Sequence, residues 1–164
     1  MSEASTAESK RIVVVRVRGE CKLKQGIEDT LKMLRLYKKN SCTVVPSSQT
    51  FIGMISKVKD FVTWGEIDEG TFKELIKKRG KLPGKQHLTE QYLKDKTQLD
   101  FDGFTKEFFG FKKELKDIPG LKTFFKLHPP LHGFERKGIK QPFSMGGALG
   151  YRKDKINELV MRMI

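Results

Sequence analysis

Residues 11–18 read RIVVVRVR, and this β-branched run sets the expectation for the whole fold. Its second half alternates Val15 and Val17 with Arg16 and Arg18, and a period of two is typical of a β-strand. Such a strand places one face on an apolar core and leaves the other face in water or on a ligand. The run is therefore predicted to be the first strand of a mixed fold.

The next segments extend this strand into a small α/β unit. Residues 24–39 carry apolar side chains every three or four positions, which predicts an amphipathic helix. Residues 42–45 predict a second strand, another helix follows, and residues 61–64 predict a third strand. Elements that alternate in this way over residues 11–66 indicate an α/β (α+β) fold, a ferredoxin-like two-layer sandwich with its helices on one face of the sheet.

Residues 67–164 are predicted to form a largely helical extension of this core, and residues 1–10, rich in Ser, Ala, Thr and Glu, a disordered tail. A helix at 71–79 has the pattern of a capping box, because Thr71 and Glu74 stand three residues apart. The further elements expected are helices at 89–96, 103–116 and 154–163 and a strand at 121–127. A group of phenylalanines is interpreted as core against the sandwich: Phe101, Phe104, Phe108, Phe109 and Phe111.

The stretch 128–150, HPPLHGFERKGIKQPFSMGGALG, is expected to be a long basic loop that interrupts this extension. It has 23 residues, Gly or Pro at eight positions and one acidic residue. A loop of this length without secondary structure is uncommon inside a domain and is usually functional or disordered. We expect its backbone to be ordered by something outside the chain.

The charge of the chain indicates what that partner is. The formal net charge is +13, which favours a polyanion over a small neutral substrate. Residues 1–65 carry 12 basic and 6 acidic side chains, residues 66–119 carry 12 and 11, and residues 120–164 carry 9 and 3. The excess is therefore confined to two separate parts of the chain.

Patterns typical of catalysis and of metal binding are missing from the sequence. Gly133 and Gly138 have the spacing of a phosphate-binding loop, but Ile139 stands where that motif needs lysine. Cys21 and Cys42 form no metal-ligand pair and are interpreted as small buried residues in a reducing compartment. We expect no catalytic residue, no metal ion, no cofactor and no membrane partner, and a soluble cytoplasmic protein.

The remaining signal is binding to a phosphate backbone, to which cations, glycine-rich backbone and aromatic rings all contribute. In the C-terminal part the candidates are Lys126, His128, Arg136, Lys137, Lys140, Gly146, Gly147, Arg152 and Lys153. In the N-terminal part they are Lys22, Lys24 and Lys57, with Ser47, Ser48 and Thr50 at a helix start that could hold an anion. Each has a plainer alternative: a solvated surface charge, an ordinary turn, or a helix cap.

Several segments resemble a known family: RVRGE at 16–20, IEDTLKMLRL at 27–36, CTVVP at 42–46, GMISKVKDFVTWGE at 53–66 and LHPPLHGFERKGIKQPFSMGGALG at 127–150. The chain resembles, over roughly residues 11–163, the L-thirty family of large-subunit ribosomal proteins in its longer archaeal form, which is related to the eukaryotic L-seven protein. The resemblance implies a three-stranded antiparallel sheet with two helices on one face, and a protein that is not an enzyme.

The resemblance also implies a place on large-subunit ribosomal RNA, beside other ribosomal proteins and near the 5S RNA. Carried over by position, the residues that face RNA are Arg16, Arg18, Lys22, Lys24, Ser47, Ser48, Thr50, Gly53 and Lys57, together with the loop.

Two other classes of protein stay open at this point. A phosphate-handling enzyme similar to acylphosphatase would share the ferredoxin-like scaffold. That family places an arginine in a glycine-rich loop directly after the first strand, whereas here Gly19 is followed by the anionic Glu20. A regulatory or DNA-architectural module would share the charge, and association with ribosomes would distinguish it.

Overall fold

The computed structural model describes residues 10–19 and 23–164, so Cys21, Lys22 and the predicted tail up to residue 9 lie outside the described residues. The strands are β1 (Arg11–Arg16), β2 (Ser41–Pro46), β3 (Val62–Glu66), β4 (Phe124–Lys126) and β5 (Gly150–Tyr151). The α-helices are α1 (Gln25–Met33), α2 (Gln49–Lys57), α3 (Glu69–Arg79), α4 (Glu90–Thr97), α5 (Phe101–Phe109) and α6 (Lys155–Met163). Short 3₁₀ turns lie at Pro83–Lys85, Leu115–Asp117 and Phe143–Met145.

The described strands form one five-stranded sheet in the order β4-β2-β1-β3-β5. The three strands predicted from the sequence are its centre, with β1 antiparallel to both β2 and β3. The expectation of a three-stranded sheet was wrong because the extension returns to the sheet twice. It adds β4 antiparallel to β2 and β5 parallel to β3, and so covers backbone groups that an edge strand would leave unpaired.

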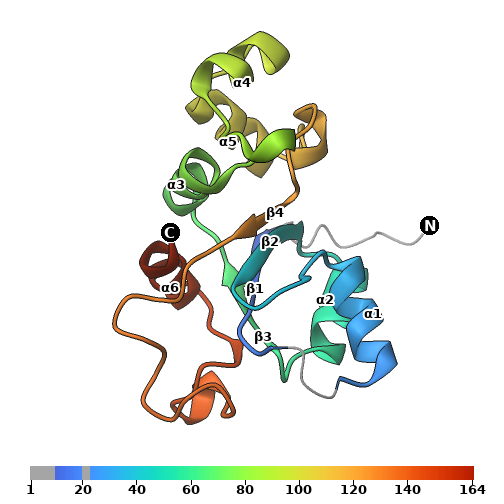
Figure 1. Ribbon diagram of the computed structural model, residues 1–164, viewed down its shortest axis with the longest axis vertical. Coiled ribbons are helices and arrows are strands. Elements are labelled where there is room, and N and C mark those ends of the chain that lie inside the picture. Colours follow the sequence, from blue (N-terminus) through green and yellow to red (C-terminus); the bar gives the residue numbers. More distant parts are fainter. Residues whose placement is uncertain (1–9, 20–22) are drawn as a thin grey trace, which may run out of the picture.

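Helices cover both faces of the sheet, so the molecule has three layers rather than the two that were predicted (Figure 1). Ile12 and Val14 of β1 pack on one face with the residues of α1 and α2. Val13 and Val15 pack on the other face with α3, α5 and α6. Every residue of β1 is buried, which overturns the expectation of a strand with one wet face.

The phenylalanine group of α5 is core, as predicted. Phe101, Phe104 and Phe108 are buried in the cluster that contains Val13 and Val15, and the Phe108 ring stacks on Phe72 of α3 with centroids 4.2 Å apart. Phe111 is instead partly exposed.

Arg11 connects the start of β1 to this aromatic group. Its guanidinium lies 4.0 Å from the ring centroid of Phe108 and 4.2 Å from that of Phe111. It also donates two hydrogen bonds to the Phe108 carbonyl, at 3.1 and 2.9 Å. Burial lowers the pKa of Arg11 and a nearby carboxylate, Glu114, raises it, with burial the larger effect. The carbonyl and the two π faces compensate for the water that the guanidinium loses.

Several predicted boundaries differ from the observed ones. Of the strand predicted over 121–127, residues 124–126 form β4. The helix predicted over 24–39 ends at Met33, because Arg35 adopts a left-handed conformation with φ 58°. The helix predicted over 103–116 ends at Phe109. The capping box is wrong, because α3 begins at Glu69 and Thr71 is a buried residue inside that helix. Among the described residues, none of the helices combines the length and the apolar character that a bilayer crossing requires.

The close contact between β3 and the segment before α6 predicts that Gly65→Ala destabilises the fold. A Cβ atom at Gly65 would lie 2.1 Å from the carbonyl oxygen of Lys153 and 2.8 Å from Ile156. We expect a loss of about 2 kcal/mol in the free energy of unfolding, measured by urea denaturation. The matched control is Gly53→Ala on α2, where a Cβ meets nothing within 4 Å; it should be neutral or gain up to about 1 kcal/mol. Equal effects of the two substitutions would contradict this packing.

Candidate nucleic-acid interface

The sheet topology brings the two positive parts of the chain to one end of the molecule. Because β1 runs antiparallel to β2 and β2 antiparallel to β4, the end of β1, the start of β2 and the end of β4 lie together. The loop 128–150 leaves from that end and returns to it at β5, whose Gly150 pairs with Thr63 near the start of β3. The two positive parts, which are far apart in the sequence, are therefore close together in space.

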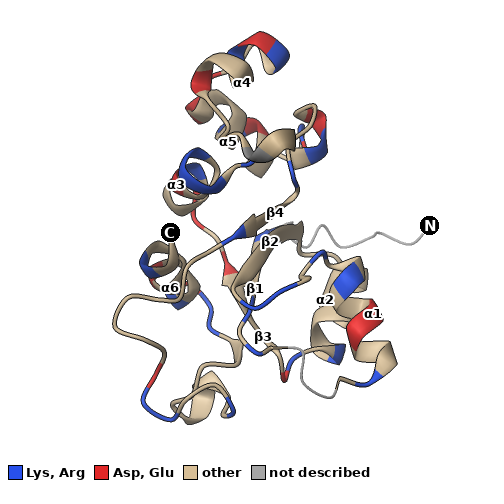
Figure 2. Cartoon of the chain, in the orientation of Figure 1, with Lys and Arg blue, Asp and Glu red and all other residues tan. Residues whose placement is uncertain are grey.

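We name the cations at this end the basic rim: Arg18, Lys24, Lys38, Lys39, Lys57, Lys126, Arg136, Lys137 and Lys140. Arg18 is half-buried and the lysines and Arg136 are exposed. In Figure 2, Lys and Arg recur along this lower end of the molecule beside a few acidic positions on α1 and the loop, whereas α4 and α5 at the top carry basic and acidic positions together. The basic rim therefore concentrates the excess charge.

Within the basic rim, Arg18, Lys24 and Lys140 line one shallow groove. The Arg18 guanidinium lies 5.0 Å from the ring centroid of Phe61 and donates a hydrogen bond of 3.2 Å to the carbonyl of Asp60. Lys24 comes from the start of α1 and Lys140 from the loop. The groove is thus built jointly by the core and the extension.

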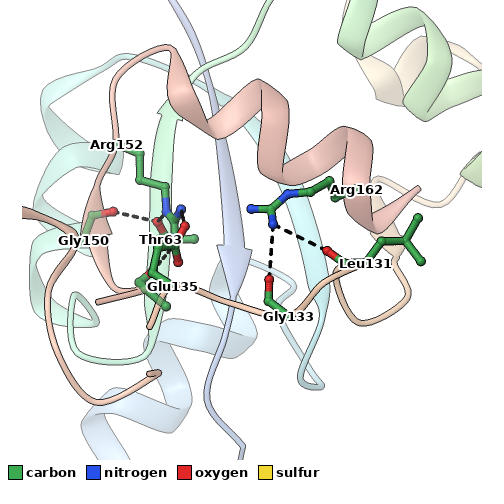
Figure 3. A network of polar contacts seen from close by, with 8 residues as sticks. Thr63, Leu131, Gly133, Glu135, Gly150, Arg152 and Arg162 are labelled. Carbon is green, nitrogen blue, oxygen red and sulfur yellow. Dashed lines mark hydrogen bonds and ion pairs between the residues drawn. The ribbon is translucent and has the colours of Figure 1, made fainter. Parts of the chain in front are cut away.

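Contacts within the chain fold the loop against β3, as Figure 3 shows. Arg152 forms a two-point ion pair with Glu135, with 2.7 Å between Nη2 and Oε2. Its Nε donates to Thr63 Oγ1 of β3 and its Nη2 to the Ala148 carbonyl, both at 2.8 Å. Only 2% of the Arg152 side chain is exposed. The expectation that an outside partner orders this backbone is therefore corrected by an ion pair within the chain, in which Arg152 is buried and Glu135 is half-buried.

A second arginine holds the first part of the loop. Arg162 of α6 donates from Nη1 to the carbonyls of Leu131 and Gly133, at 3.5 and 3.3 Å (Figure 3). The loop also contains the 3₁₀ turn Phe143–Met145, so it is not without regular structure. Both halves of the loop are therefore fixed to elements of the sheet and its last helix.

Burial and hydrogen bonding shift the pKa of the Glu135 carboxyl in opposite directions. Burial alone would raise its pKa, but the hydrogen bond and the charge of Arg152, with a backbone hydrogen bond, lower it more, and the pKa lies below its ordinary value. The charged form of Glu135 is therefore the one that the fold favours.

The glycine pair of the loop has a packing role. Gly146 has φ 89°, which a residue with a side chain rarely adopts. A Cβ at the buried Gly147 would lie 2.1 Å from the backbone oxygen of Gln141. Of the two interpretations left open by the sequence, this geometry favours the ordinary turn, because close backbone approach closes the loop on itself.

The structure separates the predicted RNA-facing residues into groups. Arg18, Lys24, Lys57, Lys126, His128, Arg136, Lys137 and Lys140 lie together at the basic-rim end. Ser47, Ser48 and Thr50 lie at the opposite end of the sheet, since the preceding residue, Pro46, pairs with Arg11. Gly53 is exposed on α2, and Lys153 is exposed after β5 beside Gly65.

Two of the predicted arginines and one serine are engaged inside the fold. Arg16 is buried and donates from Nη1 to the carbonyls of Leu36 and Tyr37, both at 2.8 Å. Arg152 is buried and donates hydrogen bonds to Glu135, Thr63 and the Ala148 carbonyl. Ser48 is the N-cap of α2 and accepts a long hydrogen bond of 3.5 Å from the Phe51 amide. These side chains have structural partners in the chain itself.

Sequence reasoning missed Glu135, Arg162 and Phe61. Glu135 carries a signal that could have revealed it, because it is the one acidic residue in a long basic loop. No sequence signal pairs Arg18 with Phe61, since they are distant in the chain. Among the described residues, no cluster of His, Cys, Asp or Glu could hold a metal ion. Cys42 is buried, which raises the pKa of its thiol well above the ordinary value.

Comparisons with known proteins agree with one another. The family model described as ribosomal protein L30p/L7e matches residues 12–62. The large ribosomal subunit protein uL30 of Methanococcus maripaludis is 48% identical over 151 residues, which are 92% of this chain and 97% of that protein. The protein of the same name from Methanopyrus kandleri is 46% identical over 90% of this chain and its own full length. That of Nanoarchaeum equitans is 47% identical over 92% and 97%.

The buried ion pair predicts that Glu135→Gln destabilises the folded loop. The substitution leaves the Arg152 charge buried without its counterion, and we expect a loss of about 2 kcal/mol at pH 7, measured by urea denaturation. Because the pKa of Glu135 is lowered in the folded state, its contribution is complete above the ordinary pKa and disappears as pH falls through the folded value. The difference from the unaltered chain should therefore shrink in acid. Glu158→Gln, at an exposed residue of α6, is the control, and a loss as large for it as for Glu135→Gln would refute the assignment.

Proposed function

We propose that this chain, which belongs to the ribosomal protein L30p/L7e family, is a structural constituent of the large ribosomal subunit and binds ribosomal RNA. The observation that supports RNA binding most directly is the basic rim, where cations from both positive parts of the chain gather. Lysine and arginine neutralise backbone phosphates and release counterions, which supplies most of the affinity of such interfaces. The family is not enzymatic, and this chain acts by binding.

The side chains that carry this binding are, in our proposal, the accessible members of the basic rim. Lys137, Lys140 and Arg136 are exposed on a folded loop, so phosphate contacts there need little further ordering of the backbone. Preorganisation of this kind lowers the entropic cost of binding. The buried Arg16 and Arg152 contribute by holding the surface in shape.

The remaining surface suits other neighbours in the subunit. The block formed by α3, α4 and α5 carries nearly balanced charge, with ion pairs such as Lys73–Asp102 and Lys94–Asp100. A balanced surface has little attraction for phosphates, and we propose that it faces neighbouring ribosomal proteins. The resemblance of the extension to the longer archaeal form supports a position near the 5S RNA, on ribosomes in the cytoplasm.

Charge reversal on the loop tests this proposal. Replacing Arg136, Lys137 and Lys140 together by Glu should weaken binding to a large-subunit RNA fragment. The fall of log affinity with log salt should become less steep by about 3, one for each phosphate contact that is lost. The thermal unfolding midpoint should change little, because these side chains are exposed. The measurement is fluorescence anisotropy over a series of salt concentrations.

The matched control reverses Lys77, Lys96 and Lys112, which are exposed on or beside α3, α4 and α5. Both triple variants change the net charge equally, so a general charge effect would weaken them alike. Equal losses, or binding that does not respond to salt, would count against the basic rim. Cosedimentation of the native chain with large subunits tests the assignment to the ribosome itself.

A further inference from the structure

We propose that the groove between Arg18 and Lys140 holds one unpaired RNA nucleotide, with its base stacked at the Arg18–Phe61 pair and its phosphates at Lys24 and Lys140. This inference rests on the proposed function and adds a specific chemistry to it. Where phosphate contacts alone would accept any RNA, a stacking site selects a base that has left its helix.

The groove is lined by aromatic, apolar and charged side chains together. Arg18 and Phe61 present a planar guanidinium and an aromatic ring, whose centres are 5.0 Å apart. Ile27 and Leu149 supply apolar surface. A base needs planar and apolar walls of this kind, whereas a phosphate alone needs none of them. The mixture therefore indicates a ligand with both an aromatic and an anionic part.

The geometry of A-form RNA separates a nucleotide from a duplex as the occupant. The groove is open to solvent, and its volume of about 400 Å³ is within the range of roughly 300–1,000 Å³ that is typical of small-ligand sites. A-form RNA presents its backbone and 2′-hydroxyls outward and keeps its bases stacked, so a duplex could touch the lysines but could not place a base on the Arg18 guanidinium that lies over Phe61. Occupation of the groove therefore requires an unpaired residue.

Two lysines of the lining can bind the phosphates on either side of that base. Lys24 is exposed and directly precedes α1. Lys140 is exposed on the loop. Among the described residues of the lining, three cations stand beside one carboxylate, Asp60. The balance favours an anionic ligand.

The groove depends on the closed loop. Leu149 follows Ala148, whose carbonyl accepts a hydrogen bond from Arg152, and Ala148 and Leu149 pack on Val17 at the end of β1. The Arg152–Glu135 pair is thus a positioning contact for the Lys140 side of the groove. Its role explains why a buried ion pair lies beside a surface that binds polyanions.

The experiment compares a short single-stranded oligouridylate with an RNA duplex that has the same number of phosphates. Arg18→Lys keeps the positive charge but removes the planar guanidinium. We expect it to weaken binding of the single strand about fivefold or more, the value of one stacked base, and to leave duplex binding and the salt slope unchanged. Arg35→Lys, the same substitution at an exposed arginine outside the basic rim, should weaken neither ligand.

Phe61→Leu provides a second variant, because it retains apolar volume while it removes the ring; its thermal unfolding midpoint is measured alongside. Equal weakening of single strand and duplex by Arg18→Lys, or no weakening at all, would overturn the nucleotide site. If those variants still bind a large-subunit RNA fragment with a steep salt dependence, only this inference fails. Absence of such binding by the unaltered chain would overturn the proposed function as well.

Discussion

The ion pair between Arg152 and Glu135 is the interaction on which the functional surface depends. Removing a guanidinium from water is costly, and a buried pair stabilises a fold only when its remaining donors are also satisfied. Here Thr63 and the Ala148 carbonyl satisfy them, so one side chain joins β3, the middle of the loop and its end. Because that loop carries Lys137 and Lys140, its closure decides where the C-terminal half of the positive charge lies.

The packing of the central strand, β1, determines where the N-terminal half of the positive charge lies. β1 is apolar on both faces because helices of the core cover one face and helices of the extension the other. The extension must therefore fold back over the sheet, and its chain returns to the same end of the sheet from which β1 leaves. The two positive parts of the sequence meet as a consequence of this packing, and the pairing of β4 with β2 and of β5 with β3 joins them directly.

The sequence predicted the elements that have long periodic patterns and missed those that have none. β1, β2, β3 and the main helices follow from apolar spacing, and the phenylalanines of α5 are core as expected. β4 lies within the strand predicted at 121–127, but it has only three residues and nothing in the sequence pairs it with β2. β5 has two residues, too few to show a period, so the five-stranded sheet was not predicted. For the site, residue type identified the cations, but only the three-dimensional structure separates the accessible Lys140 from the buried Arg152, because burial depends on partners distant in the chain.

The difference between buried arginines and exposed lysines follows from the chemistry of their side chains. Arg11, Arg16 and Arg152 are buried, and each directs several guanidinium donors to backbone carbonyls or a carboxylate in fixed directions. A lysine ammonium is compact and strongly hydrated, and the lysines of the basic rim are exposed. Part of the net charge of +13 therefore belongs to buried arginines that cannot contact a phosphate. An estimate of RNA affinity from net charge alone would count these arginines as interface. Their contribution is instead structural: Arg11 holds α5 against β1, and Arg16 and Arg152 hold the backbone that carries the lysines of the basic rim.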